Sequence, residues 1–201
     1  MTNRKLFIYE KILFLAILMI TLYGFWYFEE NYTLKLMAVV LSVIGIYAAL
    51  RKKKQEQPTS KFELTSLLIL YLGIFGLYNL LYSINLPLYA VMLAAFFLVI
   101  ALVFSVLSLD EVFELLPKTI FQTLILLLGL VTLELFLTLY FWPIDPEAKS
   151  LIIVVFFYLI TSLIYLYVHN MLRLKRIAGY VIVSLVVIAL IIVTYWIKII
   201  R

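Results

Sequence analysis

The stretch TIFQTLILLLGLVTLELFLTLYF (Thr119–Phe141) decides what kind of molecule this sequence can form. Its one charged residue is Glu134, and as a helix it is long enough to cross the hydrocarbon core of a bilayer. Its apolar residues do not alternate with polar ones, as they would in the strands of a membrane β-barrel. We therefore expect a transmembrane helix here.

The rest of the chain repeats this pattern. Hydrophobic residues make up 67% of the sequence and charged residues only 13%, whereas a soluble domain is about half apolar and a quarter charged. The charges fall in short clusters between apolar runs of roughly 17 residues or more, as in transmembrane helices. The sequence predicts an all-α polytopic transmembrane bundle, a single membrane domain with no soluble domain. We expect seven spans, at about 8–28, 33–50, 63–83, 88–108, 119–141, 149–170 and 177–197.

The positive charges predict the orientation of the chain. With seven spans and a cytoplasmic N-terminus, twelve of the sixteen lysines and arginines lie on the cytoplasmic side, as the positive-inside rule favours. We therefore expect a multi-pass protein of the cytoplasmic membrane with its C-terminus outside. The basic residues assigned to the outer side are Lys35, Lys149, Lys198 and Arg201.

Two cytoplasmic clusters of basic residues predict contact with the membrane surface. Such clusters bind anionic lipid headgroups, which we favour over the alternative, a nucleic acid or regulator at the RKKK run. The residues expected to contact headgroups are Arg51, Lys52, Lys53, Lys54, Arg173, Lys175 and Arg176.

Local signals predict two helix starts. Asp145, Pro146 and Glu147 have the pattern of an N-cap, a first-turn proline and an acid that complements the helix dipole, so they open the sixth span. Ser108–Lys118 begins with a capping box and ends next to Pro117, which predicts a short interfacial helix.

Several classes of activity lack the residues they need. The chain has no cysteine and one histidine, His169, so zinc sites with two histidines are excluded. No serine elbow and no glycine-rich phosphate loop occur, and the last span has no lysine within its depth for a retinal Schiff base. We predict a protein that is not an enzyme and that has no cofactor or metal site.

Glu134 is the strongest candidate for a functional residue. A charge in the membrane interior costs roughly 2.5–3.5 kcal/mol, so this carboxyl group should face protein or water, or be protonated. Counted along the helices, Tyr158 and Asn79 lie at a similar depth, while Thr138 shares the helical face of Glu134. The candidate polar site is therefore Glu134, Tyr158, Asn79 and Thr138.

Two interpretations of this site remain open. In one, spans three, five, six and seven line a polar pathway in which Glu134 binds a proton, a cation or a polar ligand. In the other, protonated Glu134 joins helices by hydrogen bonds. A row of polar residues on one face of the sixth span fits either interpretation: Tyr158, Thr161, Ser162, Tyr165 and His169.

Six residues of the C-terminal third stand in a characteristic order: Glu134, Pro143, Tyr158, Leu172, Tyr180 and Trp196. In this order the chain resembles a group of uncharacterised multi-pass membrane proteins from candidate-phyla bacteria with small genomes. The resemblance implies no activity, because none is established for the group. It favours Glu134 and the loop that follows it as features to test.

These observations predict a non-enzymatic membrane component or partner subunit. The first alternative is a small transporter or ligand-binding bundle that uses Glu134, and the second is an intramembrane enzyme. Small residues at four-residue spacing in the second and fourth spans are typical of close helix contacts, either within the bundle or in a homo-oligomer.

Overall fold

The structure is a computed structural model, and its described part is entirely helical. It describes residues 2–30, 32–50, 59–84, 86–107, 117–169, 171 and 173–200, without the side chains of 2–14, 44–50, 59–65, 105–107, 118 and 198–200. The helices are α1 (Thr2–Phe28), α2 (Tyr32–Leu50), α3 (Thr59–Ile84), α4 (Leu88–Leu107), α6 (Lys118–Tyr140), α7 (Pro146–Val168) and α8 (Leu174–Ile200).

Each predicted apolar segment coincides with one of these helices, so the all-helical prediction is confirmed. The largest differences lie at helix starts, where the helix includes polar residues that precede its apolar part. Helix α7, which corresponds to the sixth predicted span, begins at Pro146 with Asp145 as its N-cap, as its local sequence predicts. The Asp145 side chain, however, makes no capping hydrogen bond. Residues 51–54 and 108–116, with the predicted RKKK contact and most of the predicted interfacial helix, lie outside the described residues.

Four helices are long and apolar enough to cross a membrane, by length and composition. These stretches are Ser66–Ile84, Thr119–Tyr140, Pro146–Val168 and Leu174–Ile197. The remaining helices contribute shorter apolar stretches within their described residues, at Leu15–Phe28, Tyr32–Val43 and Leu88–Phe104. The chain therefore has the helix lengths and composition of a membrane protein.

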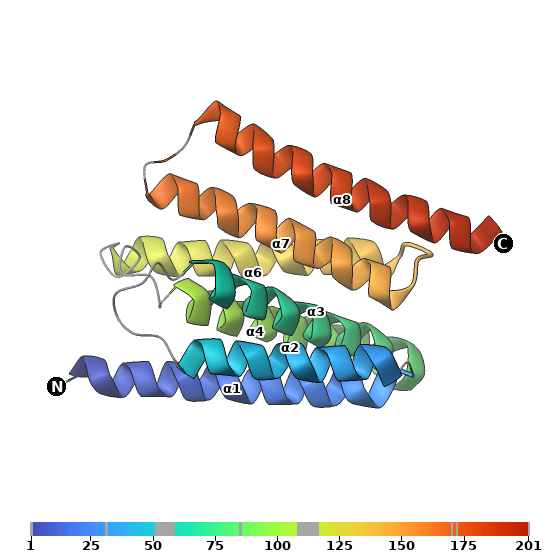
Figure 1. The fold of residues 1–201 in the computed structure, drawn as a ribbon, viewed down its shortest axis with the longest axis horizontal. Helices are drawn as coiled ribbons and strands as arrows, with labels where there is room; N and C mark the ends of the chain where they lie inside the picture. The colour runs from blue at the N-terminus through green and yellow to red at the C-terminus, as the bar shows by residue number, and fades with distance from the viewer. Residues whose placement is uncertain are drawn as a thin grey trace.

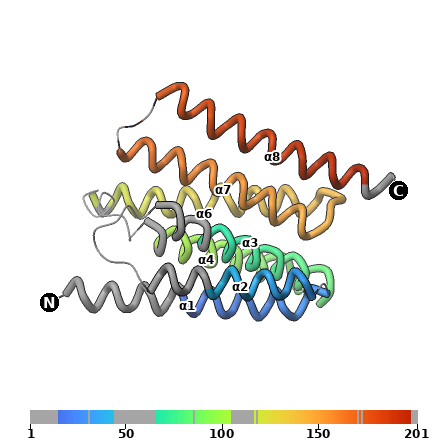
Figure 2. The backbone as a smooth tube through the Cα atoms, viewed as in Figure 1, coloured from blue at the N-terminus to red at the C-terminus, as the bar shows by residue number. Residues whose placement is uncertain are grey.

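The helices form an antiparallel bundle in successive layers (Figure 1). Helices α1, α3, α6 and α8 begin at one end of the bundle, and α2, α4 and α7 begin at the other. As a result, the start of α1 and the C-terminal end of α8 lie at opposite ends of the bundle. The tube in Figure 2 shows the same course of the backbone, with α8 at the edge beyond α7.

Helix α3 is the centre of the bundle, since it packs against α1, α2, α4 and α7. Its glycine Gly73 permits close packing, because a Cβ there would overlap Leu98 of α4 and lie 3.1 Å from Thr21 of α1. Gly129 of α6 has the same role, with Phe96 of α4 at 3.0 Å from its would-be Cβ. These approaches bring the helix axes near one another in the core.

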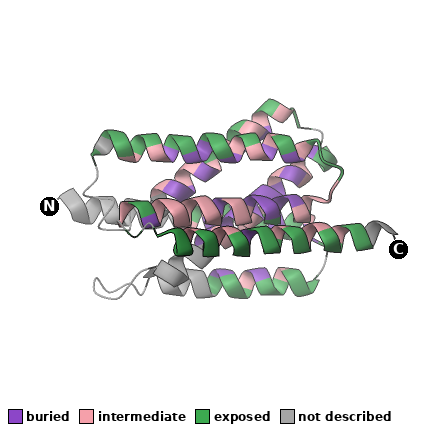
Figure 3. Ribbon diagram, turned by 90° about the horizontal axis from the view of Figure 1, so that it is seen from above, coloured by how far each residue is buried: buried purple, intermediate pink, exposed green. Residues whose placement is uncertain are grey.

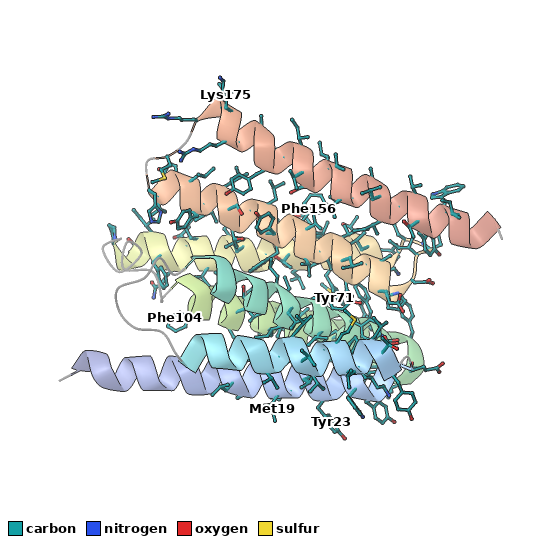
Figure 4. The ribbon with its side chains drawn as sticks, in the orientation of Figure 1. Met19, Tyr23, Tyr71, Phe104, Phe156 and Lys175 are labelled. Atoms are coloured by element: carbon teal, nitrogen blue, oxygen red, sulfur yellow. The ribbon has the colours of Figure 1, made fainter. Side chains whose placement is uncertain are left out.

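Exposure separates the central helices from the peripheral ones. Helix α8 packs mainly against α7, and most of its described residues are exposed, as Figure 3 shows. On α1, Met19 and Tyr23 point away from the bundle, whereas Tyr71 of α3 lies among the helices (Figure 4). In a membrane, the exposed apolar faces are the ones that would contact lipid or a partner.

Candidate functional site

Glu134 lies on the exposed face of α6, outside the bundle. Large apolar residues of the same face are exposed with it, among them Leu127 and Leu130. Within the described part of the chain, the Glu134 carboxyl group takes part in no hydrogen bond and no ion pair. Glu134 is six residues from the last residue of α6, Tyr140, which corresponds to about 9 Å along the axis. If α6 spans a bilayer, this acid lies within the hydrocarbon.

The threonines of the same face do not share this need for a partner. Thr138 Oγ1 donates a hydrogen bond of 2.8 Å to the Glu134 carbonyl oxygen, and Thr123 Oγ1 donates one of 2.8 Å to the Thr119 carbonyl. Both hydroxyl groups are therefore satisfied by their own helix, as is common for threonine in helices. The carboxyl group of Glu134 is the polar group on this face that still needs a partner.

The other two predicted site residues are not joined to Glu134. Asn79 is half-buried on α3, where its Nδ2 donates to the Phe75 carbonyl at 2.9 Å. Tyr158 is half-buried on α7, with its ring 6.0 Å from that of Tyr180 on α8. Among the described residues, no hydrogen bond, ion pair or ring contact connects the Glu134 side chain to either of them. Similar depth thus does not bring these residues into contact.

The polar row on the sixth predicted span is half-buried on α7. Its threonine, Thr161, donates to the Phe157 carbonyl of its own helix at 2.8 Å. His169 follows the last turn of α7, stacks on Tyr165 with ring centroids 3.9 Å apart, and places Nδ1 3.0 Å from the Tyr165 carbonyl. Much of the polarity of this row is therefore used within α7 and at its contact with α8.

A buried lysine forms a second polar site, which the sequence interpretation missed. Lys149, on the first turn of α7, is 2% exposed. Its Nζ donates to the Tyr82 hydroxyl at 2.6 Å and to the Tyr140 carbonyl at 3.2 Å. It also lies 5.0 Å from the ring centroid of Tyr82 and 5.4 Å from that of Tyr78. We use the name tyrosine cage for the groups around this amine, which are the rings of Tyr78 and Tyr82, the Tyr82 hydroxyl group and the Tyr140 carbonyl group.

The cage is assembled from two helices besides α7. Tyr78 and Tyr82 are one turn apart on α3, and their rings stack at 6.4 Å with an interplanar angle of 12°. Tyr78 is fully buried, stacks on Phe136 of α6 at 4.3 Å, and donates its hydroxyl hydrogen to the Phe136 carbonyl at 2.8 Å. These contacts fix α3 against α6 and hold the two rings beside the amine.

Several groups around the Lys149 amine carry a negative charge or a negative partial charge. The Tyr140 carbonyl belongs to the last residue of α6, where the unpaired carbonyl groups make the negative end of the helix dipole. Tyrosine ring faces attract a cation as well. The Asp145 carboxylate also interacts electrostatically with this amine. The arrangement therefore offers a buried ammonium group hydrogen-bond acceptors, ring faces and a carboxylate.

One sequence signal was available for Lys149. A lysine in the first turn of an apolar helix interacts unfavourably with the positive end of the helix dipole, so a compensating partner for its charge is expected. Two tyrosines spaced four residues apart on another helix are a suitable partner, but only tertiary structure shows that they meet the lysine. The acceptors and rings around the Lys149 amine are groups that can bind a cation. In the described residues, no group of three or more histidine, cysteine, aspartate or glutamate side chains is placed to hold a metal ion.

The comparisons with known proteins give a family but no activity. No curated protein and no solved structure matches the chain. A model of the family described as "Protein of unknown function (DUF5656)" matches residues 31–194, which include α2 to α7 and most of α8, with both Glu134 and the tyrosine cage. The chain therefore belongs to the DUF5656 family.

Proposed function

We propose that this protein is a non-enzymatic, multi-pass component of the bacterial cytoplasmic membrane that acts as a partner subunit of another membrane protein. The observation that carries the proposal is the position of Glu134, whose carboxyl group is exposed on α6 without a partner in the described part of the chain. An intramembrane acid is stable when it finds a donor, and since no donor among the described residues reaches Glu134, we infer that the donor belongs to another molecule.

The proposed topology has seven spans, with the N-terminus in the cytoplasm. It is supported by the bias of lysine and arginine and by the alternating directions of the helices. Arg173, Lys175 and Arg176 are exposed beside the start of α8, and Figure 4 shows Lys175 directed away from the bundle. In this topology they contact the anionic headgroups of the inner leaflet.

The partner is a transmembrane helix that presents a hydrogen-bond donor or a basic side chain at the depth of Glu134. Charge complementarity supports this choice over a second copy of the chain. A symmetric second copy would place one carboxyl group against another, which is unfavourable when both are ionised, and the basic residue of α7, Lys149, is already held in the tyrosine cage. Each interhelical hydrogen bond of this kind contributes about 0.6–2 kcal/mol.

The same observation favours a partner subunit over a transporter. A transport site needs its acid to face a water-filled path inside the protein, together with the groups that bind the substrate. Glu134 instead lies among exposed leucines, on the side of α6 turned away from the bundle.

A photo-crosslinking amino acid on the Glu134 face tests the proposal in native membranes. We would place it at Leu127 or Leu130, which are 52% and 49% exposed, with Leu190 on the exposed face of α8 as the control position. We expect one defined crosslinked product from α6. The yield of this product should be kept in the Glu134→Gln background, which preserves hydrogen bonding, and should fall in Glu134→Leu.

The crosslinked peptide should come from an apolar helix of another protein with a donor side chain near the attachment point. A product that is equally strong in Glu134→Leu, or that consists of lipid alone, would refute the proposal. Thr138→Val is the matched control, because its hydroxyl group bonds within α6 and its loss should leave the product unchanged.

A further inference from the structure

We propose that the tyrosine cage is a binding site for a primary ammonium ion, filled in this protein by the tethered amine of Lys149, and that the bound cation holds the last turns of α3 and α6 and the first turn of α7 together. This inference does not depend on the proposed function. It rests on the burial of Lys149 and on the contacts that its amine makes with two other helices.

The first step of the argument concerns what burial requires. A lysine that is 2% exposed is out of contact with water, and an uncompensated buried charge is strongly destabilising. A lysine with its long stem could instead extend its amine to the surface, as lysines near membrane interfaces commonly do. Since Lys149 turns inward, the cage must bind its amine better than the interface would.

The second step concerns the chemistry of the cage. An ammonium group has three N–H donors and no acceptor. Two of these donors are used, by the Tyr82 hydroxyl at 2.6 Å and by the Tyr140 carbonyl at 3.2 Å. The Tyr82 hydroxyl in turn donates to the Tyr140 carbonyl at 3.4 Å, which orients its lone pairs towards the amine. The two acceptors select a primary ammonium over a quaternary one, because a quaternary ammonium has no N–H donor, whereas an aromatic ring attracts both kinds of cation.

The third step concerns which parts of the fold the cation joins. Tyr82 belongs to the last turns of α3, Tyr140 is the last residue of α6, and Lys149 lies in the first turn of α7. The amine thus connects the first turn of α7 to the ends of two other helices. Tyr82 is 45% exposed, so the cage lies close to the surface of the protein, where a small ion could enter if the lysine side chain were removed.

Chemical rescue separates the cation from the lysine side chain. Beyond its Cβ atom, lysine is equivalent to n-propylammonium, so Lys149→Ala should leave a site that accepts this ion from solution. Lys149→Met keeps most of the stem and removes the amine, so it should leave no room for an added ion. Thermal unfolding of the purified full chain in detergent, followed by tyrosine and tryptophan fluorescence, gives the melting temperature of each variant.

We expect Lys149→Ala to lower the melting temperature by roughly 4–10 °C, because it removes the two charged hydrogen bonds that join the start of α7 to the ends of α3 and α6. n-Propylammonium chloride should restore at least half of this loss with a saturating concentration dependence. Sodium chloride, tetramethylammonium chloride and n-propanol at equal concentration should not. The wild type and Lys149→Met should respond equally little to every additive.

Two results would overturn the proposal: a Lys149→Ala variant as stable as the wild type, or n-propylammonium acting equally on Lys149→Ala and Lys149→Met. If Lys149→Ala does not fold, reductive methylation mapped by mass spectrometry provides the test. Lys149 should stay unmodified in the wild type under conditions that modify Lys35, and it should become reactive in Tyr82→Leu, which removes an acceptor and a ring face. Equal modification of Lys149 and Lys35 in the wild type would contradict the proposal.

Discussion

The exposed position of Glu134 predicts opposite effects of Glu134→Leu on stability and on association. In the isolated protein, the carboxyl group has no hydrogen bond or ion pair with another described residue, so its removal disrupts no contact of the fold. Exposed substitutions of this kind change the free energy of unfolding by about 0.5 kcal/mol or less. In an apolar environment, leucine is also the more favourable residue, so any change should be towards higher stability.

The effect on association follows from the same geometry. If a partner donates one hydrogen bond to Glu134, its loss should weaken the complex by about 0.6–2 kcal/mol, which is roughly a 3- to 30-fold change in the dissociation constant. Unfolding of the purified variant and the yield of the α6 crosslink measure the two effects separately. Glu134→Gln should preserve both the fold and most of the crosslink, because it keeps the shape and the hydrogen-bonding capacity.

The result that would refute this reasoning is a Glu134→Leu variant whose unfolding free energy falls by more than about 2 kcal/mol, well beyond the range for an exposed site. Such a loss would mean that Glu134 has a partner within its own chain. The transporter interpretation, with a polar site inside the bundle, would then regain its basis.

Three further substitutions test the packing that positions these sites, each by the unfolding free energy of the purified protein. Gly73→Val should destabilise the protein by about 1–3 kcal/mol, because the valine side chain would overlap Leu98. Gly179→Ala should be neutral or mildly stabilising, because no atom lies within 4 Å of the Cβ that it adds. Equal effects of the two substitutions would contradict the close approach at α3. Phe136→Ala should lower the unfolding free energy by about 3–5 kcal/mol, since a fully buried ring leaves a cavity, and a loss below about 1 kcal/mol would mean that α6 is not packed there. Ser184→Ala should be neutral or stabilising by about 1 kcal/mol, because the buried Ser184 hydroxyl has no hydrogen-bond partner among the described residues, so a clear destabilisation would reveal one.

The helices could be predicted from the sequence because their signal is local. Apolar runs bounded by charged or turn-forming residues locate α6 to within one residue and α7 to within three, and Asp145 and Pro146 mark the start of α7. The contacts between helices could not be predicted in this way. In α6, nearly every position is apolar, so the buried Phe136 and the exposed Leu130 look alike in sequence. In a membrane protein, hydrophobicity does not tell the packed face of a helix from the lipid-exposed one.

The candidate site shows the same limit at the level of single residues. The depth of Glu134, Asn79 and Tyr158 follows from counting along the helices, but their mutual contact depends on how each helix is rotated. The structure turns Glu134 outward and pairs the Asn79 side chain with its own helix. Conversely, Lys149 counts as one more outer charge in the sequence, and its cage exists only because Tyr82 and Tyr140 come from helices that meet it in space.

The two faces of α6 have different surroundings, because one face packs into the bundle near Lys149 and the other carries Glu134. The end of α6 is fixed through Tyr140 and its buried residue Phe136, which meet the lysine amine and the Tyr78 ring. Its opposite face carries Glu134 and has no such contact within the described chain. A helix that is held firmly on one side presents a polar group on the other at a defined depth and orientation, which is what recognition by a partner helix requires. The lysine amine held within the bundle and the Glu134 carboxyl group, which has no partner among the described residues, are therefore parts of a single arrangement, in which the first positions the second.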